Sequence, residues 1–357
     1  MNQFNIKDAY IVDKFNPDYP DISRYYENVN LELGRSHWDY KNWNPEFGDI
    51  NRYSICEWLG SGRYSDVFKS FQDGHTVCAI KILKPVNPDR VRRELRILTL
   101  LQGGPNILEL WEIVIDPVNG IPSMIMGYVD NKEWHKLYEE MKLDDIRWYT
   151  YRLLQALAYT HSQGVMHRDV KPGNILCGDP KEKLELADWG LAEFYHPLRT
   201  YSSSVGTRYY KAPELLLGYE LYNYSVDIWS VGVILIEALS LNVHLFDSDR
   251  YKMDQLDTIA KIVGGQKIVD WIKFHKPKKA DEKTVERLLK YKGVPFESLI
   301  PRKRAAFKDP DALDLVDKLL TVDNKERISA KEALKHPFFD SLRDKNANIP
   351  TISENQL

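Results

Sequence analysis

The sequence contains few cysteines, and their spacing excludes two kinds of scaffold. Cys56, Cys78 and Cys177 are the three cysteines of 357 residues, and they lie far apart. Without a CxxC motif or a Cys/His cluster, we expect neither a structural zinc site nor a disulfide framework. Sparse cysteine of this kind fits a reducing compartment.

Strong net charge and long apolar runs are also absent. The formal net charge is −3, so the overall balance attracts neither nucleic acid nor an anionic membrane, and we expect no such partner. No apolar run approaches the roughly 18 residues of a membrane span. The longest candidate, residues 226–241, is interrupted by Asp227, Ser230 and Glu237, and predicts a buried core helix instead. Residues 1–19 are polar, so we expect no secretion signal.

Apolar periodicity predicts a sheet followed by helices. From residue 53 to 83, short alternating segments broken by glycines predict an antiparallel meander, with a tight turn at 72–75. Residues 90–102 have helical spacing, and helices dominate from residue 143 onward. This order predicts an α+β fold of two lobes, a small antiparallel sheet with a helix and a larger, mainly helical lobe. The expected units are an N-terminal arm packing on the body (1–50), an N-lobe (51–126), a hinge (127–131), a C-lobe (132–340) and a C-terminal tail (341–357).

The most informative segment is residues 167–174, HRDVKPGN, which Asp188 follows fourteen residues after Asn174. This spacing is typical of phosphoryl transfer. Asp169 would accept or orient the proton of a substrate hydroxyl, and Lys171 would neutralise the γ-phosphate. Asn174 and Asp188 offer the oxygen ligands that Mg²⁺ prefers. We therefore assign catalysis to Asp169, Lys171 and Asn174, and the metal to Asn174 and Asp188.

A glycine-rich segment, residues 60–67, lies between two expected strands, where glycines allow the backbone to approach phosphates. Alone, this segment is weak evidence for nucleotide binding, because glycine-rich hairpins are common. It gains weight from Lys81 at the end of the next strand and Glu94 on the following helix. In this order Lys81 would contact the α- and β-phosphates of ATP, with Glu94 as its ion-pair partner.

Several other residues have structural interpretations. We expect Glu214 to pair with Arg327, and Asp227 to accept hydrogen bonds from backbone N–H groups. For Arg168 two interpretations stay open: it meets an anion on the segment that starts at Asp188, or it is simply a paired cation. The basic run 273–279 predicts either a solvated face, or a nuclear-import signal or surface for acidic partners.

Four segments are typical of one kinase family. They are Asp188-Trp189-Gly190, the residues 191–197 that follow, the run 80–86, and the arm motif 38–40 preceded by Val29-Asn30. With them, residues 25–339 resemble the catalytic (alpha) subunits of casein kinase II, in the CMGC group of eukaryotic protein kinases.

The resemblance implies a bilobal kinase fold that transfers phosphate from Mg-ATP to Ser or Thr followed by acidic residues. It also implies activity without phosphorylation of the activation loop, because the arm packs on that loop, with Tyr40 facing Glu193. A dimeric regulatory beta subunit would join two catalytic chains into a heterotetramer. The expected location is cytoplasm and nucleus. The expected ATP-binding residues are Leu59, Gly60, Ser61, Gly62, Arg63, Tyr64, Ser65, Val67, Ala79, Lys81, Glu94, Met126, Gly127 and Val129.

Substrate binding and nucleotide choice depart from the family pattern. The expected substrate-binding residues are Arg93, Arg168, Arg208 and Lys211. A family lysine cluster is depleted at residues 87–93, which predicts a weaker acidic preference. The hinge also differs, at Met126, Gly127 and Tyr128, so use of GTP beside ATP is left open. Several residues of the N-lobe strands differ as well, so binding of a beta subunit is left open.

Two alternatives remain at this stage. Residues 206–214 resemble the corresponding loop of proline-directed CMGC kinases, which would favour Ser-Pro substrates. A pseudokinase scaffold is the second alternative, although a scaffold has no need to keep Lys81, Glu94, Asp169 and Asp188 together.

Overall fold

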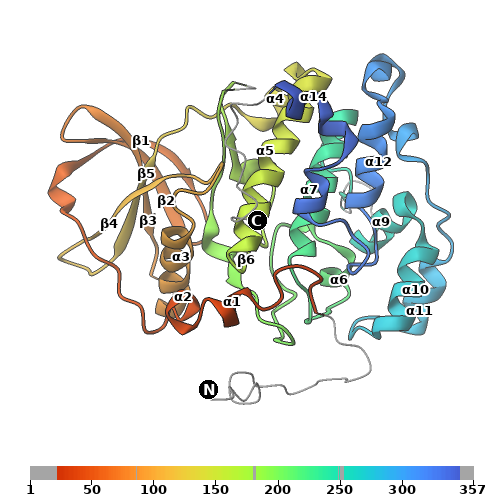
Figure 1. The fold of residues 1–357 in the computed structure, drawn as a ribbon, viewed down its shortest axis with the longest axis horizontal. Helices are drawn as coiled ribbons and strands as arrows, with labels where there is room; N and C mark the ends of the chain where they lie inside the picture. Colours follow the sequence, from red (N-terminus) through yellow and green to blue (C-terminus); the bar gives the residue numbers. More distant parts are fainter. Residues whose placement is uncertain (1–21, 86, 180–181, 248, 250–252, 346–357) are drawn as a thin grey trace.

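The computed structural model describes residues 22–85, 87–179, 182–247, 249 and 253–345. Figure 1 shows two lobes side by side, a twisted sheet carrying one long helix and a larger body of helices. The predicted α+β, bilobal fold is therefore confirmed. Residues 1–21 of the expected arm and 346–357 of the expected tail lie outside the described residues.

The N-lobe is a five-stranded antiparallel sheet in the order β1-β2-β3-β5-β4. The predicted tight turn joins β2 to β3, where Asp73 and Gly74 have φ angles of 50° and 78°. Positive φ angles at this Asp-Gly pair suit a tight hairpin, here a loop of three residues, because Gln72 pairs with Thr76. The strands are β1 (Tyr53–Ser61), β2 (Ser65–Gln72), β3 (Thr76–Leu83), β4 (Leu110–Ile115) and β5 (Pro122–Gly127).

Helix α3 (Pro88–Leu100) packs on this sheet, close to the predicted range 90–102. It begins at Pro88 because the preceding Asn87 side chain accepts a hydrogen bond from the Asp89 N–H, and proline suits a first helical position. Its buried face includes Leu95 and Leu98. It also buries Glu94, which the active site requires.

Three helices form the centre of the C-lobe: α5 (Leu143–Ser162), α7 (Ser225–Ser240) and α12 (Pro310–Leu319). Every residue of α7 is buried, which confirms the core helix predicted from the apolar run. At the start of α5, Lys142 occupies the cap position, and the Asp145 carboxylate accepts its N–H. Within the described ranges, no helix combines the length and apolar character needed to cross a membrane.

Shorter elements complete the molecule. The helices are α1 (Val29–Glu32), α2 (Arg35–Trp38), α4 (Trp134–Glu140), α6 (Pro213–Leu216), α9 (Gln255–Val263), α10 (Gly265–His275), α11 (Glu282–Leu288), α13 (Ala330–Ala333) and α14 (Asp340–Lys345). The strands are β6 (Val165–Met166), β7 (Ile175–Cys177), β8 (Leu184–Leu186) and β9 (Glu193–Phe194), paired as β6-β9 and β7-β8. These two ribbons hold the catalytic loop and the segment after Asp188.

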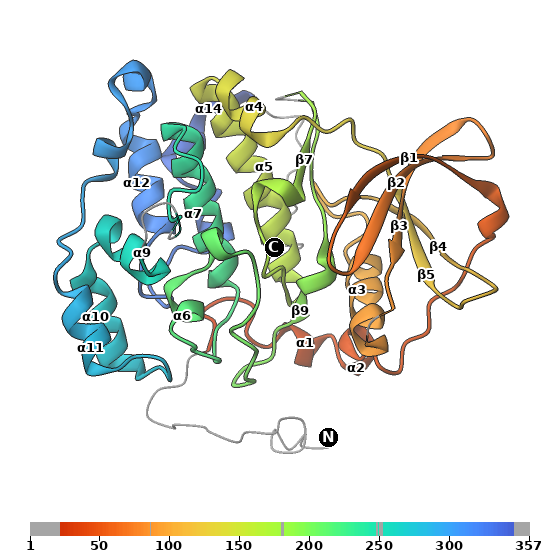
Figure 2. The same cartoon turned by 180° about the vertical axis from the view of Figure 1, so that it is seen from behind.

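The described part of the arm runs from the C-lobe to the N-lobe, with α1 beside β9 (Figure 2). Asn30 is buried, and its side-chain amide donates to the carbonyls of Gly164 and Tyr195, at 2.7 Å each. The Trp38 ring meets His196 edge-on, with ring centroids 4.8 Å apart. The arm thus packs on the segment that follows β9, as expected.

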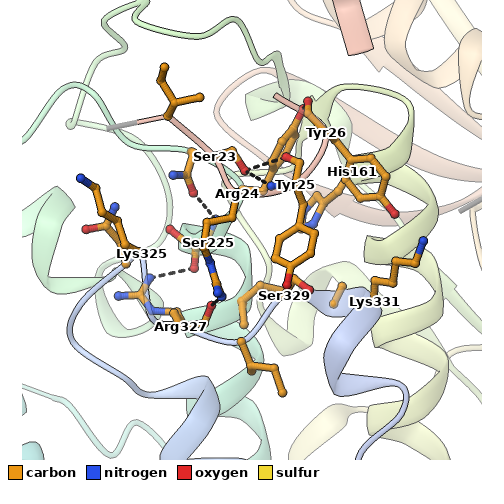
Figure 3. A pocket seen from close by; sticks show the side chains of 17 residues that line it. Ser23, Arg24, Tyr25, Tyr26, His161, Ser225, Lys325, Arg327, Ser329 and Lys331 are labelled. Atoms are coloured by element: carbon orange, nitrogen blue, oxygen red, sulfur yellow. Dashed lines mark hydrogen bonds between the residues drawn. The ribbon is translucent and has the colours of Figure 1, made fainter. Parts of the chain in front are cut away.

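At its base the arm is fixed to the C-lobe around a small cavity (Figure 3). The Ser23 N–H donates to the Tyr195 hydroxyl at 2.9 Å, and Arg24 donates to the Arg327 carbonyl at 3.3 Å. The cavity encloses about 30 Å³, which is room for a water molecule and not for a ligand.

The predicted Glu214–Arg327 pair is confirmed. The guanidinium donates to both carboxylate oxygens, at 2.7 and 3.1 Å, and both side chains are fully buried. Arg327 also donates to the carbonyls of Ser225 and Thr321. The pair therefore joins the end of the activation segment, residues 188–214, to the last part of the C-lobe.

Replacing Arg327→Ala should lower the free energy of unfolding by about 3–5 kcal/mol, because Glu214 is left charged and buried without its partner. Thermal unfolding followed by circular dichroism measures this as a fall in Tm. Arg52→Ala is the matched control, because Arg52 forms an exposed ion pair with Asp73, and it should leave Tm unchanged. Equal losses in the two variants would contradict this role.

Candidate active site

A cleft of about 490 Å³ lies between the lobes. The glycine-rich turn, the hinge and Asp188 all line it. Twelve of the fourteen expected ATP-binding residues line it: Leu59, Gly60, Ser61, Gly62, Ser65, Val67, Ala79, Lys81, Glu94, Met126, Gly127 and Val129.

Arg63 and Tyr64 are the two exceptions, and their expected role needs correction. Neither side chain lines the cleft. The Arg90 guanidinium on α3 lies 3.4 Å from the centre of the Tyr64 ring, a cation–π contact that fixes the tip of the turn to α3. The sequence missed residues that line the cleft from more distant positions, among them Leu98, Leu108 and Leu176.

Lys81 joins three elements at the back of the cleft. Its ammonium lies 2.6 Å from Glu94 Oε1 on α3 and 2.8 Å from Asp188 Oδ1. Burial works against this charge, but the two carboxylates outweigh it and hold the pKa of Lys81 above its ordinary value. Burial likewise opposes the Asp188 carboxylate, but Lys81 outweighs it and lowers the pKa of Asp188 to about 2. Asp188 is therefore ionised at neutral pH.

The three expected catalytic residues lie together. The Asp169 carboxylate lies 2.9 Å from the Lys171 ammonium and accepts a hydrogen bond from the Asn174 amide at 3.2 Å. Its other oxygen accepts from the backbone N–H and the hydroxyl of Thr207, both at 2.7 Å. Thr207 was not among the expected site residues, and only its place at the end of the activation segment could have suggested it.

The buried carboxylate of Asp227 fixes the backbone of the catalytic loop, residues 167–174. Asp227 accepts hydrogen bonds from the N–H groups of His167 and Arg168, at 2.8 and 2.7 Å, which confirms its expected role. Arg168 and Asp188 both have left-handed backbone conformations, with φ angles of 66° and 61°. Such angles are unfavourable for residues with a Cβ and persist where surrounding bonds enforce them, commonly at functional sites.

The residues present fit a magnesium ion bound with a nucleotide. Asn174 and Asp188 line the same cleft and offer an amide oxygen and an ionised carboxylate. In the part of the chain that the structure describes, no cluster of three or more His, Cys, Asp or Glu could hold a metal ion alone. Mg²⁺ commonly needs no such cluster, since it keeps waters and shares ligands with substrate phosphates.

The four expected substrate-binding residues divide into two pairs. Arg93 donates to Glu193 at 2.6 Å, and the buried Arg168 lies 3.8 Å from the same carboxylate. Arg168 therefore meets an anion on the activation segment, which decides between its two interpretations and removes it from the substrate-binding set. Arg208 is exposed and pairs with Asp249, whereas Lys211 lines a small cavity with Asp169.

Tyr40 packs on the activation segment beside Glu193. Its ring stacks on Phe194, with centroids 6.4 Å apart and planes 9° apart, and its side chain reaches Arg199. The ion-pair partners of Glu193 within the described residues are Arg93 and Arg168, and the expected approach of Tyr40 to Glu193 stays a prediction.

The model of the protein kinase domain family matches residues 53–339, most of the chain. The chain belongs to the protein kinase family. The match begins at the first residue of β1 and includes every residue of the cleft described above. The protein is therefore a phosphotransferase that binds ATP, which members of the family use with Mg²⁺. When bound, Mg-ATP would supply the phosphoryl group, and Asp169, Lys171 and Lys81 are the residues that would position and neutralise the reacting groups.

Asp169→Asn should reduce turnover by about 10²–10⁴-fold, because the amide cannot take up the proton of the acceptor hydroxyl. Nucleotide binding does not require that proton, so Mg-ATP should raise Tm in the variant as in the wild type. Asp270→Asn, an exposed change on α10, is the control and should leave turnover unchanged. Near-native turnover in Asp169→Asn would contradict the assignment.

Proposed function

We propose that this kinase phosphorylates serine and threonine in acidic sequence contexts, as a kinase of casein kinase II type, and that it needs no phosphorylation of its own activation segment. The position of Glu193 carries the proposal that the activation segment needs no phosphate. The contacts of the arm give further support to this part. The exposed basic residues support the preference for acidic substrates.

Many kinases order the activation segment by phosphorylating it, so that arginines bind the new phosphate. In this chain a carboxylate already supplies the negative charge. Glu193 on β9 meets Arg168, which directly precedes Asp169, and Arg93 on α3, the helix that also carries Glu94. One charge thus connects the catalytic loop, the activation segment and the N-lobe helix.

The arm supports the same ordered state. Asn30 and the Trp38 ring hold residues 195–196 from outside, through the contacts described above. The His37 ring lies 2.9 Å from the Gln163 carbonyl, just before β6, the partner strand of β9. These contacts require no modification of the chain.

Lys171, two residues after Asp169, supports serine and threonine specificity. Its ammonium reaches both Asp169 and the Thr207 hydroxyl, at 2.9 and 3.1 Å. Arg208 and Lys211 support the acidic preference, since both are cations within six residues of Gly206, which lines the cavity beside Asp169. The loss of Arg168 from this set agrees with a preference weaker than that of the family.

The regulatory subunit and the location belong to the same proposal. The N-lobe sheet leaves several large apolar side chains exposed, among them Ile55, Trp58 and Val77. Such a surface supports binding of a dimeric beta subunit, with a heterotetramer as the assembly. We assign the kinase to cytoplasm and nucleus.

Three peptides test substrate choice: Ser followed by acidic residues, Ser-Pro, and Ser preceded by arginines. With Mg-ATP, we expect the highest kcat/KM on the acidic peptide, because the cations beside the site attract its carboxylates. Preference for Ser-Pro would place the chain in a proline-directed branch instead. Absence of transfer to all three, with no rise of Tm on adding Mg-ATP, would favour a scaffold.

Glu193→Gln tests the origin of the activity. The amide no longer neutralises Arg168 and Arg93, so we expect the activation segment to lose order and turnover to fall by about tenfold or more, which corresponds to about 1.4 kcal/mol. Glu140→Gln removes a similar carboxylate from an exposed ion pair on α4 and should leave turnover unchanged. A fully active Glu193→Gln variant would contradict the proposed role.

A further inference from the structure

The glycine-rich turn, residues 60–67, contains two glycines that no neighbouring side chain requires. Neither Gly60 nor Gly62 has a positive φ angle. A Cβ added to Gly60 would meet no atom within 4 Å, and one added to Gly62 would reach only the Ser65 carbonyl, at 3.7 Å. The glycines thus leave open space, which suits the close approach of a phosphate. The turn must therefore be fixed by contacts from other elements.

Lys84, directly after β3, fixes the base of the turn. Its ammonium donates to the Ser61 hydroxyl at 3.0 Å and to the Gly62 carbonyl at 2.8 Å. The same ammonium pairs with Asp66 on β2 at 3.0 Å. The backbone N–H of Lys84 donates to the Tyr64 carbonyl at 2.8 Å. One residue thus holds both sides of the turn through its base, and the Tyr64 side chain at the tip has a different partner.

The partner of the tip is Arg90 on α3. Its guanidinium carbon lies 3.4 Å from the centre of the Tyr64 ring, which is stacking distance for a cation–π contact. In the ranges that the structure describes, no carboxylate pairs with Arg90, and its buried Nη2 has no hydrogen-bond partner. The guanidinium is therefore held mainly by the ring. Arg63 also lies 5.3 Å from this ring centre, but it is the next residue in the chain and cannot attach the turn to another element.

Arg90 shares one side of α3 with two residues whose ion pairs are described above. Arg93 and Glu94 follow it by three and four positions, a spacing that makes side chains neighbours on a helix. Arg93 meets Glu193 of the activation segment, and Glu94 meets Lys81 in the cleft. The glycine-rich turn, the activation segment and the cleft are therefore attached to adjacent positions of one helix.

We propose that Arg90 is a positioning residue for the nucleotide: through the Tyr64 ring, it holds the glycine-rich turn over the site of the ATP phosphates. The turn then follows the position of α3, and the affinity for Mg-ATP follows the turn. The inference depends on nucleotide binding in the cleft and not on the preference for acidic substrates. Among the cations that remain in residues 87–93, Arg90 thus serves the nucleotide and not the substrate.

Arg90→Ala tests this role through the KM for ATP, measured with a saturating amount of the best of the three peptides described above. We expect this KM to rise about three- to tenfold, because a cation–π contact that holds the turn is lost. The Kd for Mg-ATP, measured by calorimetry without peptide, should rise by the same factor. We expect kcat to stay unchanged, because Glu94 and Asp169 keep their contacts. Arg92→Ala removes the same charge from an exposed position of α3 and should behave like wild type.

A double-mutant cycle tests whether Arg90 acts through Tyr64. Tyr64→Ala should raise the KM for ATP to a similar extent, and combining it with Arg90→Ala should add little, because both changes remove one contact. Tyr64→Phe keeps the aromatic face and should retain the wild-type KM. Both residues are only partly buried, so we expect the variants to fold, and their Tm without nucleotide checks this.

Four results would overturn the proposal. An unchanged KM for ATP in Arg90→Ala would show that the contact does not position the nucleotide. Full additivity of the two alanine changes would show that Arg90 and Tyr64 act separately. An equal rise of KM in Arg92→Ala would indicate a general effect of charge. A rise of KM for the peptide alone would place Arg90 on the substrate surface.

Discussion

The active arrangement depends on the ion pairs that the Glu193 carboxylate forms with two arginines. This carboxylate is buried and meets Arg93 from the N-lobe helix and Arg168 from the catalytic loop. Without Glu193, both arginines would lose their carboxylate partner. For the buried Arg168 this would leave an uncompensated charge inside the protein, which is unfavourable. The three elements are therefore held together or lost together. The position of Asp169 follows, because Arg168 is its immediate neighbour.

In the nucleotide cleft, the buried ammonium of Lys81 joins separate elements in the same way. Lys81 connects β3, α3 and Asp188, so α3 is fixed at two points, by Glu94 to the cleft and by Arg93 to the activation segment. A rotation of α3 would break both contacts. This coupling links the order of the cleft to the order of the activation segment.

Much of the fold and of the candidate site could be predicted from the sequence, because these features depend on residues that are close together in the chain. The fully buried α7, the Asp-Gly hairpin and the HRDVKPGN motif depend on neighbours within a few residues, and each was found. Partners that are distant in the chain were found less well. Thr207 meets Asp169 across thirty-eight residues, and the Tyr64 ring turns to Arg90 instead of the cleft. Arg93 meets Glu193 across one hundred residues, and sequence spacing carries no information on this pairing.

The central claim is that the activation segment is ordered without phosphate, and the turnover of phosphatase-treated protein tests it most directly. Peptide-level mass spectrometry first establishes that the treated protein carries no phosphate in residues 188–214, and kcat on the preferred peptide is then compared before and after treatment. The account predicts the same kcat in both samples, because Glu193 supplies the charge permanently. A large loss of kcat on dephosphorylation, restored by rephosphorylation within this segment, would contradict it.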